Sequence, residues 1–255
     1  MTPHEEPTSD RRTAADQSFW SLLDAPTRNA LRAAGHLRTY APRTLLLRQD
    51  DRSDHIFVLR SGCVKVYTDS DTGYRAVLAL RSAGDLVGEQ SGLNRRPRSA
   101  SVCALIEVQA LVVTAGRFGA MLKASPVVAH AVQQVLSQRL RDADRQRAAV
   151  GSASPESRLA GLLIQLAGRY GVRTADGSVR IELPLSQEDL AGLLVSSLRT
   201  VSRILEHWRR EGILTTGRQV LELADLRALR ERANTPGELR GSGPRLSPRP
   251  PPRYG

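Results

Sequence analysis

The chain has 255 residues, of which 40% are hydrophobic and 25% charged, so it can form one large domain or two ordinary ones around a buried core. Its 37 Lys and Arg residues outnumber the 26 Asp and Glu residues, and the net charge of +11 favours an anionic partner, nucleic acid above a membrane surface. No run reaches the roughly 18 apolar residues of a membrane span, and the N-terminus lacks a signal-peptide core, so we expect a cytoplasmic protein. Two cysteines are too few for a four-thiolate iron–sulfur or zinc site, and the five histidines show no ligand spacing, so we expect no metal.

Residues 17–124 combine a short helical opening with a series of short apolar runs. The preceding residues, 1–16, are polar, and we expect them to be disordered. Turn signals separate the apolar runs, which lie at residues 44–47, 55–59, 63–67, 76–80 and 101–113. Many short strands at even spacing predict an all-β barrel or jelly roll over this part of the chain.

A long helix is predicted next, over residues 125–150. Ser125 and Pro126 provide a cap followed by proline at the first helical position. A narrow apolar stripe runs along the helix and consists of Val128, Val132, Val135, Leu136, Leu140 and Ala143. Arg139 lies at the edge of this stripe, where we expect its charge to stay in water. A narrow stripe on a charged helix predicts a two-stranded contact between subunits, and the alternative is packing against the chain's own barrel.

Residues 151–234 begin with a hinge at 151–153 and include two short helices with a tight turn between them. Ser186 is placed to cap the first helix, and Asp189 stands three residues on, where a side chain can reach back to the cap. The pattern breaks at Val195, and Ser197 caps the second helix. The second helix buries Val201, Ile204 and Leu205 and exposes Arg199, Thr200, Ser202 and Arg203. This pattern predicts a helix-turn-helix, and the alternative is a solvated amphipathic helix in a small helical domain.

The exposed face of the second helix has the chemistry that a DNA major groove requires. Its cations can pair with phosphate, and arginine also reads guanine edges. A hairpin with a glycine turn at residues 213–221 makes the motif a winged helix-turn-helix. The expected DNA contacts are Ser186, Ser197, Leu198, Arg199, Thr200, Arg203 and Arg218. Residues 235–255 are rich in Pro and Arg, and we expect a disordered basic tail.

Residues 84–89 and 97–100 together have the chemistry of a sugar-phosphate pocket. Gly88 lets the backbone approach a ligand, and Glu89 can accept a hydrogen bond from a ribose hydroxyl. Arg98 offers a planar fork to phosphate, and Ser99 adds a hydroxyl and a backbone N–H. The alternative interpretation is a structural ion pair between Arg98 and Glu89.

The order of all these parts resembles the CRP/FNR family of bacterial transcription regulators over residues 19–233. The likeness is carried by the strand at 62–66, the turn at 83–89, the Arg-Ser-Ala triplet at 98–100 and the helix-turn-helix at 185–205. The resemblance implies an α+β fold with an N-terminal jelly-roll β-roll of the cyclic-nucleotide-binding type, a long dimerisation helix and a C-terminal winged helix-turn-helix. It also implies a homodimer that binds a palindromic operator in double-stranded DNA, with RNA polymerase as a further partner.

The effector pocket departs from the family pattern on the side where a base would lie. Cyclic-AMP-responsive members have a Thr-Ser pair in the central helix, and Ala143 and Asp144 stand at those positions here. Ala143 cannot form a side-chain hydrogen bond, although Asp144 could accept one from a base amino group. By resemblance, the effector-binding residues are Gly88, Glu89, Arg98, Ser99, Ala100 and Asp144. These departures disfavour cyclic AMP, and another cyclic nucleotide, another anionic effector and DNA binding without an effector stay open.

The DNA-reading helix departs from the family pattern as well. Val195 stands where the family usually has Gly, and a β-branched residue is strained at positive φ. Leu198 replaces a base-reading Arg, Arg199 replaces a base-reading Glu, and Arg203 keeps the third reading position. The resemblance therefore implies an operator that differs from the usual half-site.

Two other classes of function are weaker alternatives. An enzyme controlled by a nucleotide-binding domain would need a catalytic domain after the hinge, and these roughly eighty residues hold no nucleophile–base or metal constellation. A scaffold that uses only the β-roll would not need a winged helix-turn-helix. The sequence therefore favours a DNA-binding regulator that is not an enzyme.

Overall fold

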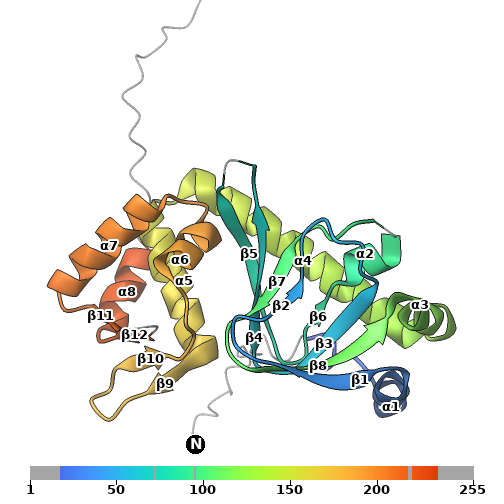
Figure 1. The fold of residues 1–255 in the computed structure, drawn as a ribbon. Coiled ribbons are helices and arrows are strands. Elements are labelled where there is room, and N and C mark those ends of the chain that lie inside the picture. The colour runs from blue at the N-terminus through green and yellow to red at the C-terminus, as the bar shows by residue number, and fades with distance from the viewer. Residues whose placement is uncertain (1–17, 72, 95, 218–219, 235–255) are drawn as a thin grey trace, which may run out of the picture.

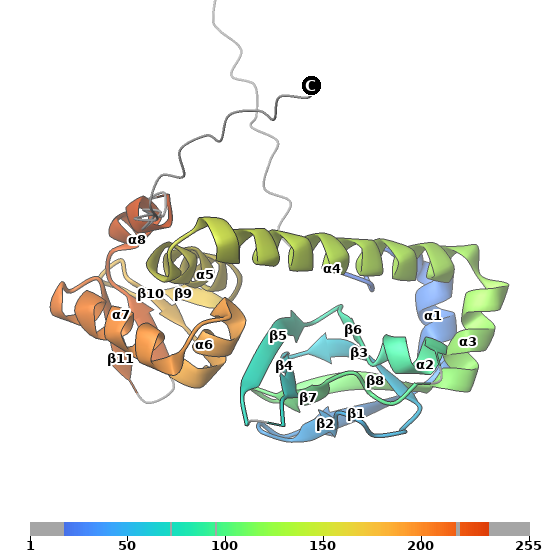
Figure 2. The ribbon, with the colours of Figure 1, turned by 90° about the horizontal axis from the view of Figure 1, so that it is seen from above.

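The computed structural model describes residues 18–71, 73–94, 96–217 and 220–234. Figure 1 shows the α+β architecture, with a β-roll on one side and a smaller helical domain on the other, and a long helix joins them in Figure 2. The segments predicted to be disordered, 1–16 and 235–255, lie outside the described residues, as does Arg218. Within the described part of the chain, no helix is both long and apolar enough to cross a membrane.

The N-terminal half is a β-roll of two four-stranded antiparallel sheets, which confirms the predicted β fold. One sheet has the order β1 (His36–Tyr40), β8 (Val108–Thr114), β3 (His55–Ser61) and β6 (Leu86–Val87). The other has the order β2 (Leu45–Leu47), β7 (Ser101–Ala104), β4 (Cys63–Asp69) and β5 (Arg75–Ser82). Phe57, Leu59, Val64, Val102 and Val112 are among the residues in the core between the sheets, and β3 and β8 bury their other face in a second core.

Two crossings between the sheets meet at one point, where only glycine fits. The apolar run predicted at 101–113 is two strands, β7 and β8, which belong to different sheets. The chain crosses between them near Glu107, and it makes another crossing from β3 to β4 at Gly62. Gly62 has φ +84°, and a Cβ there would lie 2.1 Å from the Glu107 carbonyl oxygen. The close approach of two backbones therefore explains this glycine.

Three helices cover one end of the β-roll: α1 (Ala25–Ala34), α2 (Glu89–Asn94) and α3 (Ala115–Ala124). Asp24 caps α1 by accepting a hydrogen bond from the Thr27 N–H at 2.9 Å, and Thr114 caps α3 in the same way. A second core forms where α1 and α3 meet the sheet and the start of the long helix, and it includes Phe19, Leu31, Phe118 and Val128.

The long helix α4 (Pro126–Ser152) packs its first half against its own domain, contrary to the prediction of one continuous subunit stripe. Val128, Val132 and Val135 are at most 9% exposed and belong to the second core. Leu140 is 62% exposed, so the apolar stripe divides into a covered and an uncovered part.

The predicted hinge at 151–153 is also shorter, because the helix continues through Ser152 and ends at Ala153.

The C-terminal domain has the predicted winged helix-turn-helix, with one further helix on each side. Its helices are α5 (Pro155–Tyr170), α6 (Gln187–Leu194), α7 (Leu198–Arg210) and α8 (Leu226–Ala233). A small antiparallel sheet has the order β11 (Leu214–Gly217), β12 (Val220–Leu223), β10 (Val179–Ile181) and β9 (Gly171–Arg173). The strands β11 and β12 form the wing.

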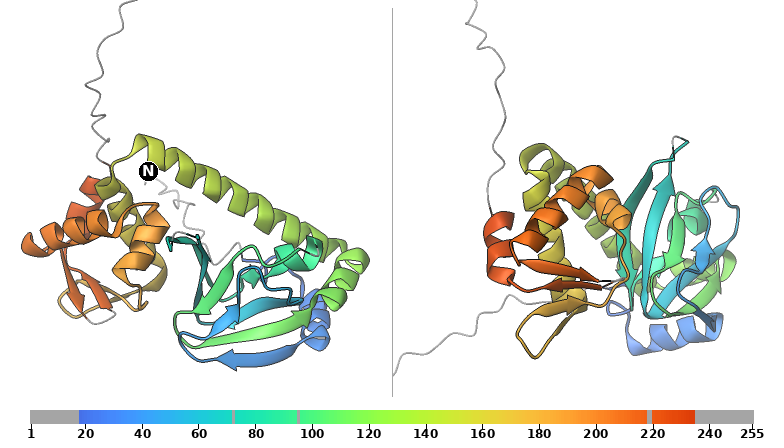
Figure 3. Two further views of the ribbon diagram at one scale, coloured as in Figure 1. Left: turned by 45° about the horizontal axis from the view of Figure 1, so that its top comes forward. Right: turned by 60° about the vertical axis from the view of Figure 1, so that its left-hand side comes forward.

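The two domains contact each other directly, as the two views of Figure 3 indicate, with α6 facing β4 and β5. Lys65 Nζ on β4 donates to Asp189 Oδ1 on α6 at 2.6 Å. Gly192 allows α6 to approach β5, since a Cβ there would lie 2.8 Å from the Val77 backbone nitrogen. Cys63 of the β-roll belongs to the same buried cluster as the core of the C-terminal domain. The helix-turn-helix is therefore docked on the β-roll.

The turn between α6 and α7 is the strained one that the sequence predicts. Val195 ends α6 in the left-handed region, with φ +50° and ψ +54°. Its side chain is 52% exposed, so little apolar packing compensates the strain. A β-branched residue in this region is unusual, because its Cβ crowds the adjacent carbonyl oxygen.

We expect Val195→Gly to raise the free energy of unfolding by about 1 kcal/mol. The left-handed conformation costs an L-residue about 1–2 kcal/mol, and the added chain entropy of glycine offsets part of that gain. The opposite change, Gly212→Val, should destabilise the chain, because Gly212 has φ +72° and no atom near its Cβ position. Urea denaturation measures both variants, and a loss of stability in Val195→Gly would contradict the assignment of strain.

Candidate functional site

The polar residues predicted to bind an effector gather at a cavity between the β-roll and α4, which we call the α4 cavity. Its volume is about 560 Å³, and β5, β7, the turn before α2, α4 and the end of α6 contribute to its wall. The structure brings together five of the six predicted residues, namely Gly88, Glu89, Arg98, Ser99 and Ala100. The volume is within the usual range for a small-molecule site.

Arg98 is held by the chain itself. Its guanidinium donates to the Gly88 carbonyl at 2.7 Å and the His55 carbonyl at 2.6 Å, and to the hydroxyls of Ser53 and Ser91. The residue is 2% exposed, and burial lowers the pKa of its guanidinium. Four of its five N–H groups are therefore engaged before any ligand arrives.

Gly88 makes this arrangement of Arg98 possible. It has φ +81°, and a Cβ at this position would lie 3.0 Å from Arg98 Nη1 and 2.9 Å from Leu47 Cδ1. The absence of a side chain at Gly88, predicted to leave room for a ligand, thus also leaves room for Arg98 to reach the Gly88 carbonyl.

Glu89 pairs with Arg139 of α4. The sequence predicted a different partner for Glu89, either a ribose hydroxyl or Arg98. Arg139 Nη1 donates to Glu89 Oε1 at 2.6 Å, and Nη2 donates to the Leu86 carbonyl. The side chain of Glu89 is 4% exposed and that of Arg139 is 19% exposed, so the prediction that the Arg139 charge stays in water is wrong. No ion pair joins Arg98 to Glu89 within the described residues, and the structural pair expected between them is replaced by the pair with Arg139.

The base side of the α4 cavity offers few neutral hydrogen-bonding groups. Ala143 lines the wall and contributes only a methyl group. Asp144 is absent from the wall, and its exposed carboxylate pairs with Arg147 at 2.8 Å. Ser99 lines the other side, and its hydroxyl donates to Gln90 Oε1 at 3.2 Å. Glu89, the predicted ribose acceptor, and Arg98, the predicted phosphate partner, already have partners within the chain, and the base side lacks the hydroxyl pair. The residues present therefore do not fit cyclic AMP.

Arg81 on β5 is a cation of the α4 cavity that sequence reasoning missed. Its guanidinium has one hydrogen-bond acceptor in the described structure, the Leu80 carbonyl at 3.1 Å. Burial, and then repulsion from Arg139, lower the pKa of Arg81 to about 10. Arg81 directly follows the apolar run at 76–80, which predicts only a strand, so no local signal marked it as a site residue. Four arginines, Arg81, Arg98, Arg139 and Arg147, line the cavity together with the single acid Glu89.

The first helix of the helix-turn-helix has the predicted capping box. Ser186 Oγ accepts from the Asp189 N–H at 3.0 Å, and Asp189 Oδ2 accepts from the Ser186 N–H at 3.0 Å. The Ser186 hydroxyl also donates to Asp189 Oδ2. The hydroxyl predicted to contact DNA is thus already engaged in the cap, and the Ser186 side chain serves the start of α6.

The second helix, α7, divides into a buried apolar face and an exposed cationic face. Val201, Ile204, Leu205 and Trp208 are at most 8% exposed, and Trp208 Nε1 donates to Glu156 Oε1 on α5 at 3.0 Å. Ser197 caps the helix by accepting from the Thr200 N–H at 3.0 Å. Arg199 and Arg203 are exposed, and neither side chain has a partner among the described residues. The structure thus places both arginines where they are free to bind an anion.

Comparison with known proteins identifies the two halves of the chain. Residues 37–125 match the cyclic nucleotide-binding domain family, and residues 157–232 match the Crp-like helix-turn-helix domain family. The cyclic AMP receptor protein of Thermus thermophilus is 29% identical over 194 residues, which cover 76% of this chain and 86% of that protein.

Two further similarities have broader coverage. The nitrogen fixation regulation protein FixK of Azorhizobium caulinodans is 28% identical over 224 residues, 86% of each chain. The solved structure of CLP, a c-di-GMP responsive global regulator of Xanthomonas campestris, has the same fold, with a TM-score of 0.70 over 79% of this chain and all of that one at 22% identity. The chain belongs to the CRP/FNR family of transcription regulators, with an N-terminal cyclic nucleotide-binding domain and a C-terminal Crp-like helix-turn-helix.

Proposed function

We propose that this transcription regulator is a homodimer that binds a palindromic operator through α7 and the wing, under the control of an anionic effector in the α4 cavity. The observation that carries the proposal is the exposed face of α7, with two unpartnered arginines above a fully buried apolar face. We divide the chain functionally into an effector domain at 17–124, a dimerisation helix at 125–150 and a DNA-binding domain at 151–234. We assign it no catalytic activity, since the similar proteins are regulators.

The physical basis for DNA binding is a cationic surface on a rigid helix. Arg199 lies in the first turn of α7 and Arg203 one turn later on the same face, so both can reach one stretch of groove. The net charge of +11 supplies long-range attraction to phosphate. We place the protein in the cytoplasm because DNA is its partner, and we propose RNA polymerase as a second partner on the ground of family alone.

We expect Arg199→Ala and Arg203→Ala each to weaken operator binding by ~1–3 kcal/mol. Loss of a base contact relaxes specificity at one base pair, whereas loss of a phosphate contact weakens all sequences alike and lowers the salt slope. The control is Arg230→Ala on α8, which removes an exposed arginine outside the reading face. Binding measured against salt distinguishes the two kinds of contact, and unchanged affinity in both variants would exclude α7 from the interface.

The uncovered part of α4 supports a dimer seam. Leu136, Leu140 and Ala143 follow one another at the four- and three-residue spacing of a two-stranded coiled contact, and Val150 lies seven residues after Ala143, with Arg147 at the position between them. Leu140 and Val150 are 62% and 41% exposed, while the covered valines of the same helix pack on the β-roll. We therefore move the seam from the first half of α4 to its second half, where Leu140 and Val150 are exposed.

We expect Leu140→Asp to yield monomers that bind the operator weakly. A dimer would place two carboxylates at its axis, and desolvating them costs several kcal/mol. Ala148→Asp is the matched control, since Ala148 is exposed on the same helix outside the seam. Sedimentation at micromolar concentration measures both variants, and a monomeric wild type would refute the dimer.

The charge of the α4 cavity supports an effector with at least two negative charges. Arg98 and Arg139 are satisfied within the chain, but Arg81 is a partly buried cation with a single carbonyl acceptor and no paired carboxylate among the described residues. A buried unpaired charge is costly, so an anion that reaches Arg81 gains a charge-assisted hydrogen bond. The described lining has four arginines and one acid, so the two phosphates of a cyclic dinucleotide suit its net charge better than one phosphate. The engaged state of Arg98 favours the alternative, which is DNA binding without an effector.

Calorimetry with cyclic di-GMP, cyclic GMP and cyclic AMP distinguishes these options. We expect the dinucleotide to bind and Arg81→Met to weaken that binding at least tenfold, or about 1.4 kcal/mol, because a charge-assisted contact is lost. Arg180→Met, an exposed arginine on β10, is the control. Absence of heat from all three nucleotides supports binding without an effector. Heat from cyclic AMP that Arg98→Ala abolishes would refute our interpretation of the cavity.

A further inference from the structure

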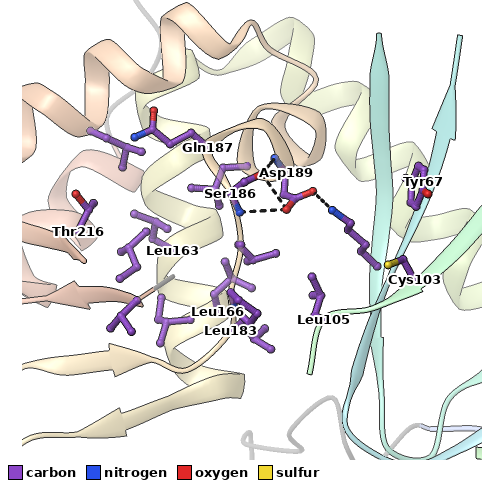
Figure 4. Close-up of a pocket in the computed structure, with 18 of the residues that line it drawn as sticks. Tyr67, Cys103, Leu105, Leu163, Leu166, Leu183, Ser186, Gln187, Asp189 and Thr216 are labelled. Atoms are coloured by element: carbon purple, nitrogen blue, oxygen red, sulfur yellow. Dashed lines mark hydrogen bonds and ion pairs between the residues drawn. The ribbon is translucent and has the colours of Figure 1, made fainter. Parts of the chain in front are cut away.

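A second cavity lies between the two domains, and we call it the interdomain cavity. Its volume is about 550 Å³, and it shares no lining residue with the α4 cavity. Figure 4 shows its two sides, with the leucine-rich surface of the C-terminal domain facing the strands of the β-roll. The apolar wall includes Leu105, Leu163, Leu166, Ile181 and Leu183.

Cationic groups gather at one side of this apolar wall. Lys65 on β4 approaches α6, where its Nζ lies 2.6 Å from Asp189 Oδ1. Arg43 and Arg75 also line the cavity, and Asp189 is the one carboxylate in the lining. Arg75 is paired with Asp69 outside the wall, whereas the Arg43 side chain has no partner among the described residues. The lining thus has more positive than negative charge.

The cation that contacts Asp189 is a lysine in a chain whose other cations are nearly all arginine. The chain has 37 Lys and Arg residues, and all but Lys65 and Lys123 are arginine. Lys65 presents a compact ammonium with three N–H donors in place of a broad guanidinium. One donor is directed at Asp189, so others are available to a second carboxylate.

We propose that the interdomain cavity is a binding site for an amphipathic monocarboxylate, with an unbranched chain of medium length. The carboxylate pairs with Lys65 and Arg43, and the chain lies against the leucines of the C-terminal domain. Burial of each CH₂ group contributes about 0.8 kcal/mol, and the charged end supplies orientation. Sites at domain interfaces with apolar walls and a few convergent polar groups are the usual form of ligand pocket.

A ligand in the interdomain cavity would stabilise the docked arrangement of the two domains. Both domains supply its wall, so a ligand that binds the docked arrangement stabilises it over any other by its binding free energy. The two cavities share no lining residue, so a ligand in one leaves the other unoccupied.

A cysteine in the wall provides a reporter for this cavity alone. Cys103 is half-buried and lines the interdomain cavity, whereas it is absent from the α4 cavity. Burial raises the pKa of both thiols, and it raises that of Cys63, which is only 1% exposed, to about 11, so Cys63 reacts more slowly. The rate of maleimide labelling of the full chain therefore measures access to the interdomain cavity.

The test compares three ten-carbon probes: decanoate, 1-decanol and decyltrimethylammonium. We expect millimolar decanoate to slow labelling of Cys103 at least tenfold, and the neutral and cationic probes to have much smaller effects. Lys65→Met should abolish the protection, Lys65→Arg should retain it, and Lys123→Met should leave it unchanged. Circular dichroism checks that each variant is folded.

A second variant keeps the test decisive if Lys65→Met does not fold. Val220 lines the cavity from the wing and is 37% exposed, so Val220→Trp should fill space with little effect on folding and reduce protection by decanoate. Absence of protection by decanoate overturns the proposal. Equal protection by decanol, or protection that survives both Lys65→Met and Val220→Trp, overturns it as well.

Discussion

Asp189 uses both carboxylate oxygens at the boundary between the two domains. Oδ2 accepts from the backbone and hydroxyl of Ser186 and thereby starts α6, while Oδ1 accepts from Lys65 of the β-roll. The side chain is 5% exposed, so its charge depends on these partners. The same residue thus defines the first helix of the DNA-binding motif and its position on the effector domain.

Other buried charges of the β-roll are also compensated by groups of the same chain. Burying a charge is unfavourable unless hydrogen bonds or a counter-charge compensate it. The chain compensates Arg98 with carbonyl and hydroxyl acceptors, and it pairs Arg139 with Glu89. Residues of a family's ligand pocket can therefore stabilise the fold through contacts within the chain, even where the ligand that they bind differs. Arg81 departs from the pattern, since its partly buried guanidinium has a single carbonyl acceptor among the described residues, and this exception indicates where an anion would bind.

Much of the fold was predictable because local rules decide it. The caps at Ser125, Ser186 and Ser197 were read from residue type and spacing, and the structure has all three. The alternation of short apolar runs and turns predicted the β-roll for the same reason. The division of the run at 101–113 into β7 and β8 was missed, because both strands are apolar and the crossing depends on contact with a distant glycine.

The sequence by itself determined the order of the domains, the family and the residues that begin each helix, because hydrophobic period, capping and motif spacing are local properties. Only the tertiary structure decided which charges meet. Arg139 and Glu89 are 50 positions apart and Lys65 and Asp189 are 124 apart, so no periodicity links them. The same holds for the stripe on α4, since its two halves look alike in sequence and differ only in whether the β-roll covers them.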